Sequence, residues 1–312
     1  MGDKIATREA YGKALAEFGA IYDNIVVLDA DLASATKTGV FKKAFPDRHF
    51  DCGIAENNMI CVAAGMSLCG KIPFASTFAM FAAGRSFEQI RNSIGYPHNN
   101  VKIGATHAGI TVGEDGATHQ CCEDIALMRT IPGMVIINPA DAIEARLAVK
   151  AAIEYYGPVY LRFGRMAVAN VNAEDYEFRI GKGTKMADGT DVALIATGLE
   201  VEQALMAREL LAAEGISASV VNISTIKPLD EELVVAEAAR CGAVVTCEEH
   251  SVIGGLGAAV CECLAEKKPT PVLRVGMEDI FGRSGPAKDL ISYFHMDAAS
   301  IAAKAKAAIA LK

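Results

Sequence analysis

The chain has 312 residues and a formal net charge of −8 at pH 7. It contains no block of lysines and arginines that would neutralise phosphates, so we expect no nucleic-acid binding. Nine scattered cysteines without zinc or haem spacing are expected to be reduced thiols, and no stretch approaches the roughly 18 apolar residues of a membrane span. These features predict a cytoplasmic protein that contacts no membrane, with none of its own residues predicted as metal ligands.

Short β-branched runs alternate with Ala-rich helical patterns through the first half of the chain. We expect strands at 24–30, 71–76, 101–107, 134–140 and 158–163, separated by helices near 5–19, 56–70, 78–95, 122–131 and 141–156. This alternation predicts a mostly parallel sheet with helices on both faces.

The alternation breaks at 170–191, which is polar and rich in Gly and Asp, as a linker would be. It then restarts, with strands expected at 191–197, 217–223, 243–249 and 270–276 and helices at 199–214, 230–240, 254–266 and from about 297. We therefore predict two doubly wound α/β domains, at 1–172 and 191–312, joined by a linker at 173–190.

Glu56 lies in the run DCGIAENN, between small and apolar neighbours. An ionised carboxylate is expensive to keep where water is scarce, so such a group is expected to share a proton with a partner. The alternative is a solvated glutamate at the start of a helix, paired with the first-turn amides. These eight residues alone do not separate the two interpretations.

The stretch 104–120, GATHAGITVGEDGATHQ, follows a predicted buried strand and is dense in polar chemistry. His107 and His119 flank a Gly-rich turn that carries Glu114 and Asp115. Open α/β sheets place their ligand crevices beyond the carboxyl ends of the strands, which favours a binding or catalytic site here. The alternative is an ordinary turn, because GEDG by itself is a turn sequence.

Several motifs resemble the C-terminal half of transketolase, in the same order and at fitting spacings. They are VLDADLASATKTG (27–39), DCGIAENNM (51–59), PFASTFAMF (73–81), THAGITVGEDGATHQ (106–120), NPAD (138–141), STIKPLD (224–230), EEHSVIGGLG (248–257) and DIFGRSG (279–285). The resemblance covers nearly the whole chain. It implies a pyrimidine-binding domain for thiamine diphosphate, followed by the smaller C-terminal domain of the family.

The resemblance also implies a partner chain. A complete transketolase binds the diphosphate and metal of its cofactor through Gly-Asp-Gly followed by Asn, and this chain has no convincing copy of that motif. We therefore expect the C-terminal subunit of a split transketolase. An N-terminal subunit would hold most of the thiamine diphosphate with Mg²⁺ or Ca²⁺, and the present chain would homodimerise within a heterotetramer.

Five residues match cofactor contacts of the family. Glu56 matches the acid that bonds the pyrimidine ring and drives it into its imino form, and its apolar neighbours would favour the protonated carboxyl. Phe78 and Phe81, three apart on an expected helix, match aromatic residues that contact the pyrimidine, with core packing as the alternative. Asp31 and Leu32 match a loop that reaches the cofactor, although Asp31 would also suit a helix cap.

Five residues match substrate contacts of the family. Arg8, His107 and Arg165 match groups that hold a sugar phosphate, for which forked arginines are well suited. Asp115 and His119 match residues that bond the sugar hydroxyls and the keto end. The resemblance thus assigns catalytic roles to Glu56, Asp115 and His119.

The chain departs from the family pattern at two positions. Gly84 stands where the family has a third aromatic residue, which leaves the ring pocket looser or filled by a neighbour. Ala35 stands where a substrate serine is expected, so Ser34 or Thr36 would have to supply the hydroxyl. A separate ambiguity concerns Arg162, which is close in sequence to Arg165; we prefer Arg165 on motif register.

The expected activity is transfer of a two-carbon ketol unit from a ketose phosphate to an aldose phosphate. One alternative is a subunit of another thiamine diphosphate enzyme, similar to 1-deoxyxylulose-5-phosphate synthase or to the beta subunit of a 2-oxo acid dehydrogenase. Another is a non-catalytic regulatory subunit that retains the fold. VIGGLG (252–257) lacks the full spacing of a dinucleotide fingerprint, so we expect tight helix–sheet packing there.

Overall fold

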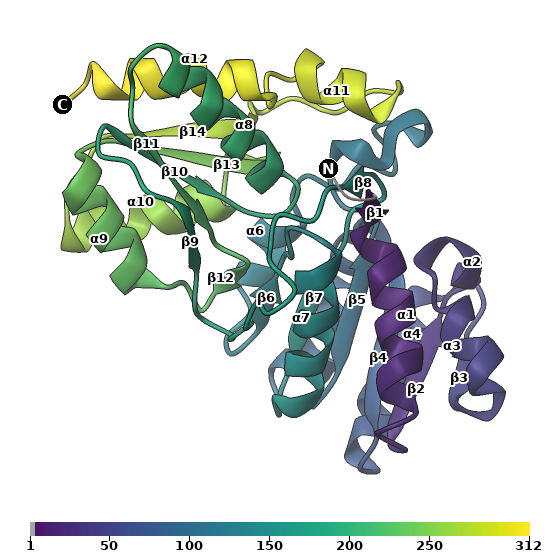
Figure 1. Ribbon diagram of the computed structural model, residues 1–312. Coiled ribbons are helices and arrows are strands. Elements are labelled where there is room, and N and C mark those ends of the chain that lie inside the picture. The colour runs from purple at the N-terminus through teal and green to yellow at the C-terminus, as the bar shows by residue number, and fades with distance from the viewer. Residues whose placement is uncertain (1–3) are drawn as a thin grey trace.

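The computed structural model describes residues 4–312 and has two α/β domains, each built on its own sheet (Figure 1). Residues 1–3 of the predicted first domain lie outside the described residues. The first domain carries a seven-stranded sheet and the second a five-stranded sheet, both mainly parallel. The predicted fold class, two doubly wound α/β domains, is confirmed.

The seven-stranded sheet includes one strand from the second half of the chain. Its strands are β2 (Ile25–Asp29), β3 (His49–Asp51), β4 (Ile72–Phe78), β5 (Lys102–Thr106), β6 (Val135–Ile137), β7 (Val159–Arg162) and β12 (Thr225–Lys227). They lie in the order β12-β6-β7-β5-β4-β2-β3, and every neighbouring pair except β12 with β6 is parallel.

Helices cover both faces of this sheet. They are α1 (Thr7–Gly19), α2 (Ala33–Thr36), α3 (Gly39–Ala44), α4 (Glu56–Leu68), α5 (Phe87–Gln89), α6 (Asp124–Arg129) and α7 (Ala142–Glu154), with short helical turns η1 (Pro46–Arg48), η2 (Met80–Arg85), η3 (Ile90–Gly95) and η4 (Ile110–Asp115). Successive strand residues point to opposite faces. Val27 of β2 accordingly packs with α1 and α7, whereas Val26 packs with α4 and η3.

The second domain repeats this plan with fewer strands. The strands are β9 (Thr184–Ala187), β10 (Val192–Ala196), β11 (Ala218–Asn222), β13 (Val244–Ser251) and β14 (Val272–Met277); the helices are α8 (Glu200–Ala213), α9 (Glu231–Cys241), α10 (Leu256–Lys267), α11 (Ala287–Tyr293) and α12 (Ala298–Ile309). Leu194 of β10 packs with α8 and α12, and the next residue, Ile195, packs with α9 and α10. A small ladder of β1 (Ile5–Ala6) and β8 (Ala167–Val168) completes the strands described.

The expected helix at 78–95 is found from residue 79, as two π-helical segments around a short α-helix, but it does not include Phe78. Phe78 is the last residue of β4 and pairs with Thr106 of β5, and the rest of the segment divides into η2, α5 and η3. All residues of β4 are buried between the two helical layers, an environment that favours strand pairing up to Phe78. Ser86, with a φ of −106°, separates η2 from α5.

Five strands fall outside the predicted pattern: β1, β3 and β8, which are two or three residues long, and β9 and β12. β9 lies inside the expected linker 173–190 and pairs antiparallel with β11. β12 follows β11 in the chain but pairs antiparallel with β6 of the first domain. The second domain therefore completes the sheet of the first, and the two domains share hydrogen bonds as well as packed surfaces.

Candidate active site

Parallel pairing brings five of the predicted site residues to one edge of the first sheet. Phe78 ends β4, His107 follows β5 directly, and Asp31 lies two residues after the end of β2. Arg165 lies just after β7, and Glu56 begins the helix that follows β3. The carboxyl ends of parallel strands meet at one edge, so these side chains line up in the strand order β7-β5-β4-β2-β3.

Aromatic and cationic groups stack on one another at this edge. The His107 ring lies 3.8 Å from the Phe78 ring, with 26° between the planes, and Phe78 lies 5.7 Å from Phe81, with 12° between them. The Arg85 guanidinium lies over the Phe81 ring, 4.5 Å from its centroid. His119 meets Phe81 edge-on at 5.6 Å. Phe78 and Phe81 thus present their rings together, as expected, although strand and helical turn do this rather than one helix.

Glu56 is the first residue of α4 and is 2% exposed. The interpretation as a solvated helix-start glutamate is therefore wrong about solvation. Its Oε2 accepts a hydrogen bond from Nη1 of Arg85 at 2.9 Å, and the Arg85 side chain is 49% exposed. The carboxylate is therefore not alone among apolar groups, because a half-exposed guanidinium links it to the ring of Phe81.

Arg8 and His107 form the centre of a basic cluster. Nη1 of Arg8 lies 2.8 Å from Nε2 of His107 and 3.0 Å from the carbonyl oxygen of Ala35. A guanidinium only donates, so Nε2 accepts and Nδ1 carries the proton, which it directs to Oγ1 of Thr106 at 2.9 Å. Nε of Arg8 is buried and has no hydrogen-bond partner among residues 4–312.

Electrostatics keep His107 neutral. Burial, followed by the positive charges of Arg8, Arg165 and Lys37 and by His119, lowers the pKa of His107 to about 3. Burial and the charge of Arg165 also lower the pKa of Arg8. Several cations therefore lie close enough to repel one another, and an anion placed among them would relieve that repulsion. His107 also holds a φ of 56°, in the left-handed region that is uncommon for residues other than glycine.

The loop at 109–120 carries the remaining predicted residues. The Asp115 side chain is exposed and His119 is half-buried. Nη1 of Arg165 bonds Oε2 of Glu114 at 2.9 Å, so this loop and the end of β7 are joined. Arg162, in contrast, is buried and pairs through Nε with Oδ2 of Asp124 at 2.9 Å. The choice of Arg165 over Arg162 agrees with these positions.

The loop after β2 is organised by a buried aspartate. Oδ2 of Asp29 accepts hydrogen bonds from the hydroxyls of Thr36 at 2.8 Å and Thr38 at 2.9 Å, and its Oδ1 accepts from the Leu32 backbone N–H. Asp31 is exposed, with a φ of 60°.

The loop after β2 tests two expectations from the sequence: Asp31 as a helix cap, and Ser34 or Thr36 as the substitute hydroxyl. The Asp31 side chain does not cap α2, so the helix-cap interpretation is wrong. Of the two hydroxyls considered in place of the missing serine, that of Thr36 is buried on Asp29, whereas Ser34 is exposed.

Sequence reasoning missed two residues at this site, Arg85 and Lys37, and it missed the pairing of Glu114 with Arg165. Arg85 lies four residues after Phe81, a spacing that places two side chains on the same face of a helical turn. That spacing was the available signal for Arg85. No comparable signal exists for Lys37 or Glu114, because their neighbours come from segments distant in sequence.

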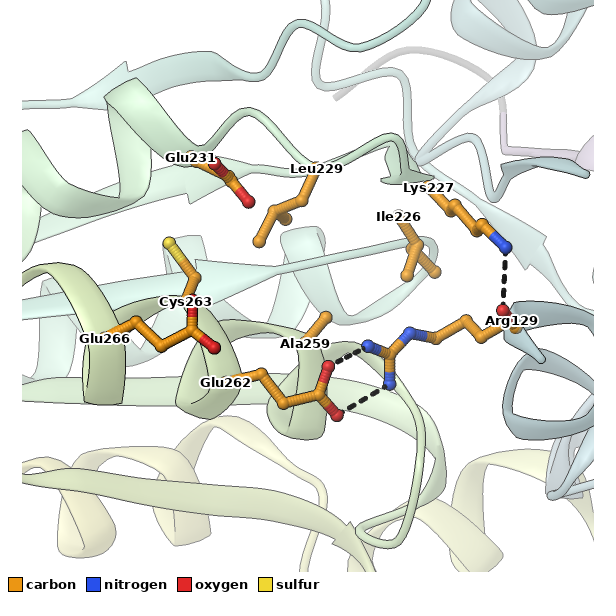
Figure 2. A pocket seen from close by; sticks show the side chains of 9 residues that line it. All are labelled: Arg129, Ile226, Lys227, Leu229, Glu231, Ala259, Glu262, Cys263 and Glu266. Carbon is orange, nitrogen blue, oxygen red and sulfur yellow. Dashed lines mark hydrogen bonds and ion pairs between the residues drawn. The ribbon is translucent and has the colours of Figure 1, made fainter. Parts of the chain in front are cut away.

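A separate cavity of about 320 Å³ lies between the domains (Figure 2). Two bonds join residues of its lining: Nη2 of Arg129 bonds Oε2 of Glu262 at 2.5 Å, and Nζ of Lys227 donates to the Arg129 carbonyl oxygen at 2.7 Å. None of the predicted site residues lines it.

The described part of the chain has neither the residue clusters of a metal site nor a helix suited to a membrane. Among residues 4–312, no three His, Cys, Asp or Glu side chains are grouped so that they could hold a metal ion. None of the helices in the described part of the chain combines the length and apolar character needed to cross a membrane.

Comparison with known proteins identifies both domains. Residues 3–170 match the transketolase pyrimidine-binding domain, and residues 181–301 match the transketolase C-terminal domain. The chain is 52% identical over 298 residues to a putative transketolase C-terminal section of Methanocaldococcus jannaschii, which covers 95% of this chain and 93% of that protein.

Two further relatives are similar over nearly their whole length. A 6-deoxy-6-sulfo-D-fructose transketolase subunit of Clostridium sp. is 44% identical over 294 residues, covering 94% of this chain and 91% of that protein. A solved structure described as a split gene transketolase, inactive beta4 tetramer, has a TM-score of 0.92 at 53% identity and covers 99% of this chain and 100% of that one. The chain therefore belongs to the transketolase family, as the C-terminal subunit of a split transketolase.

Proposed function

We propose that this subunit, together with an N-terminal transketolase subunit, transfers a two-carbon ketol unit from a ketose phosphate to an aldose phosphate. One observation carries the proposal: a buried carboxylate beside stacked rings and a cluster of mutually repelling cations lie at the same sheet edge. The first arrangement suits the pyrimidine ring of thiamine diphosphate, and the second suits the anionic end of a sugar.

The cofactor residues fit thiamine diphosphate by their chemistry. When bound, the cofactor supplies the carbanion that takes up the ketol unit. Glu56 bonds the pyrimidine nitrogen and shares a proton with it, while Arg85 holds Oε2 of this buried carboxyl group in place. Phe78 and Phe81 offer parallel ring faces to a flat heterocycle, and Asp31 and Leu32 contact the cofactor from the end of β2.

The substrate residues divide by charge. Arg8 and Arg165 hold the phosphate, and neutral His107 orients Arg8 through the bond between Nη1 and Nε2. Asp115 and His119 bond the sugar hydroxyls and the keto end from the rim of the loop. Sulfonates present similar anionic oxygens, and one relative is named for a sulfonated sugar, so both kinds of substrate belong in the test.

The partner supplies what this chain does not carry. In this proposal, the N-terminal subunit binds the diphosphate with Mg²⁺ or Ca²⁺, and two copies of the present chain pair within a heterotetramer in the cytoplasm. Support for the partner comes from the match to the two C-terminal domains of the family. The relative described as an inactive beta4 tetramer supports self-association of such chains.

The test is reconstitution. The purified chain alone is expected neither to bind thiamine diphosphate and Mg²⁺ tightly nor to turn over ketose phosphates, and addition of the N-terminal subunit is expected to restore both. Binding is measured by calorimetry, and turnover is measured with phosphorylated and sulfonated ketoses as donors. Robust activity of the lone chain would refute the division of the site between subunits.

A further inference from the structure

We infer that Glu249 of the C-terminal domain is a positioning residue: it holds the loop at 109–120 in the shape that presents Asp115 and His119. The inference rests on the proposed function for what these two residues do. It also gives the C-terminal domain a part in the reaction without placing any of its atoms on the substrate.

The first observation is a buried bond from one domain to the other. Glu249 lies on β13 and is 3% exposed, and its Oε1 accepts a hydrogen bond from the Thr111 backbone N–H at 2.6 Å. Gly109 has a φ of 77°, and a Cβ at that position would overlap the Glu249 carboxylate. The loop therefore closes over this carboxylate, and only glycine allows the close approach.

The second observation is an independent attachment at the other end of the loop. Nε2 of Gln120 donates to the carbonyl oxygen of Ile110 at 3.0 Å and to that of Arg283 at 2.9 Å. A Cβ on Gly116 would overlap the side chain of Ser284. The segment 283–285 of the C-terminal domain thus forms a second support on which the loop lies.

The third observation is that Glu249 is itself fixed. Its backbone carbonyl oxygen accepts a hydrogen bond from Nη2 of Arg162 at 2.8 Å, and Arg162 is paired with Asp124. Arg162 ends β7, three residues before Arg165. The backbone of Glu249 is thereby bonded to β7, the strand that ends three residues before Arg165.

These contacts matter because the loop has little stiffness of its own. Gly109, Gly113 and Gly116 all have positive φ, and glycines leave the backbone free to adopt other conformations. The Thr111 N–H is buried, so the loop is stable only with an acceptor such as Glu249 beneath it. Loss of that acceptor would let Asp115 and His119 move while the sheet below stays folded.

Glu248 provides a matched control. It is the neighbouring residue on β13 and is fully buried, and it accepts hydrogen bonds from the backbone N–H groups of Leu256 at 2.6 Å and Gly257 at 2.7 Å. It therefore makes the same kind of bond but supports α10 rather than the loop.

The first measurement is hydrogen exchange on the isolated full chain, which needs no activity. Glu249→Leu is expected to speed exchange at residues 111–116 by about 10-fold or more, because one buried hydrogen bond is lost. Glu249→Gln, whose amide oxygen still accepts, is expected to stay near wild type. Glu248→Leu is expected to speed exchange at the start of α10 and to leave 111–116 unchanged.

The second measurement uses the complex with the N-terminal subunit. Glu249→Leu is expected to lower kcat and raise KM for the donor sugar, while the affinity for thiamine diphosphate stays within about twofold of wild type, because Glu56 and the aromatic rings do not touch Glu249. Glu248→Leu is expected to keep the wild-type kcat and KM. If Glu249→Leu does not fold, Glu249→Asp, which draws the acceptor back by one methylene, is expected to give the same pattern more weakly.

Two outcomes would overturn the inference. One is wild-type exchange at 111–116 in the folded Glu249 variants, and the other is equal kinetic losses in the Glu248 and Glu249 variants. Faster exchange in a complex that turns over no ketose would instead refute the proposed function and leave the support of the loop by Glu249 standing.

Discussion

Both domains place a glycine-rich turn after a parallel strand, and the two turns differ in the polar side chains that lie inside them and at their tips. In the turn at 252–257, the carboxylate of Glu248 occupies the N-terminus of α10 by bonding Leu256 and Gly257. In the loop at 109–120, the carboxylate of Glu249 likewise bonds the Thr111 N–H from beneath, but the tip of the loop, with Asp115, is open to solvent. Neighbouring carboxylates of β13 thus hold both turns, and the turns differ because only the loop at 109–120 exposes charged side chains at its open tip. The expected helix–sheet packing at VIGGLG agrees with the filled turn at 252–257.

The largest expected effect concerns the candidate active site of the first domain, the solvent-open region of this comparison. Glu56→Gln keeps the shape of the side chain but cannot donate a carboxyl proton, so turnover in the reconstituted complex should fall about 10²-fold or more. Turnover is measured with saturating cofactor, and circular dichroism checks the fold. Near-wild-type turnover would return Glu56 to a purely structural role at the start of α4.

The next effect separates substrate class from reaction class. Arg8→Ala or Arg165→Ala should raise KM for phosphorylated acceptors by about 10- to 100-fold, because charge-assisted bonds worth about 1.5–3 kcal/mol are lost. KM for glycolaldehyde, which has no phosphate, should hardly change. Equal losses with both acceptors would mean that the arginines hold the loop through Glu114 or the subunit interface.

A third prediction tests the filled turn at 252–257. A Cβ on Gly255 would overlap Oε2 of Glu248 and lie 2.7 Å from Nδ1 of His250, so Gly255→Ala should lower the free energy of unfolding by about 1–3 kcal/mol. The control is Gly65→Ala on α4, where no atom lies within 4 Å of the added Cβ, and which should be neutral or slightly stabilising. Urea unfolding of the isolated chain compares them. A fully stable Gly255→Ala would show that the turn is looser than this packing requires.

The last effect is a change in pH dependence. The folded chain holds His107 neutral, with a pKa of about 3 against 6.5 for a free histidine. Between these two pH values, His107 is therefore protonated in the unfolded chain but not in the folded chain. Stability is therefore lost as pH falls from 6.5 towards 3, and His107→Gln should make that decline shallower. Unfolding between pH 4 and pH 7 measures the slope, with the exposed His295 changed to Gln as control. Parallel slopes for wild type and His107→Gln would contradict the assigned neutral state.

Periodicity was enough to predict the layered architecture, because buried parallel strands and amphipathic helices leave strong patterns. It failed at Phe78, where a fully buried strand and a helix carry the same apolar signal. The site residues could be named from motifs, but their partners could not. Arg85 reaches Glu56 from 29 positions away and Glu249 reaches Thr111 from 138, and such pairs are set by the fold alone.

The strand β12 has a consequence for how this chain could be divided. It covers β6 of the first sheet, whose residues Val135, Ile136 and Ile137 are all apolar and buried. A fragment ending within 173–190 would lack β12 and leave β6 as a bare apolar edge, the kind of surface on which strands of other molecules add. Such a fragment is expected to aggregate, so the two domains are best expressed as one chain.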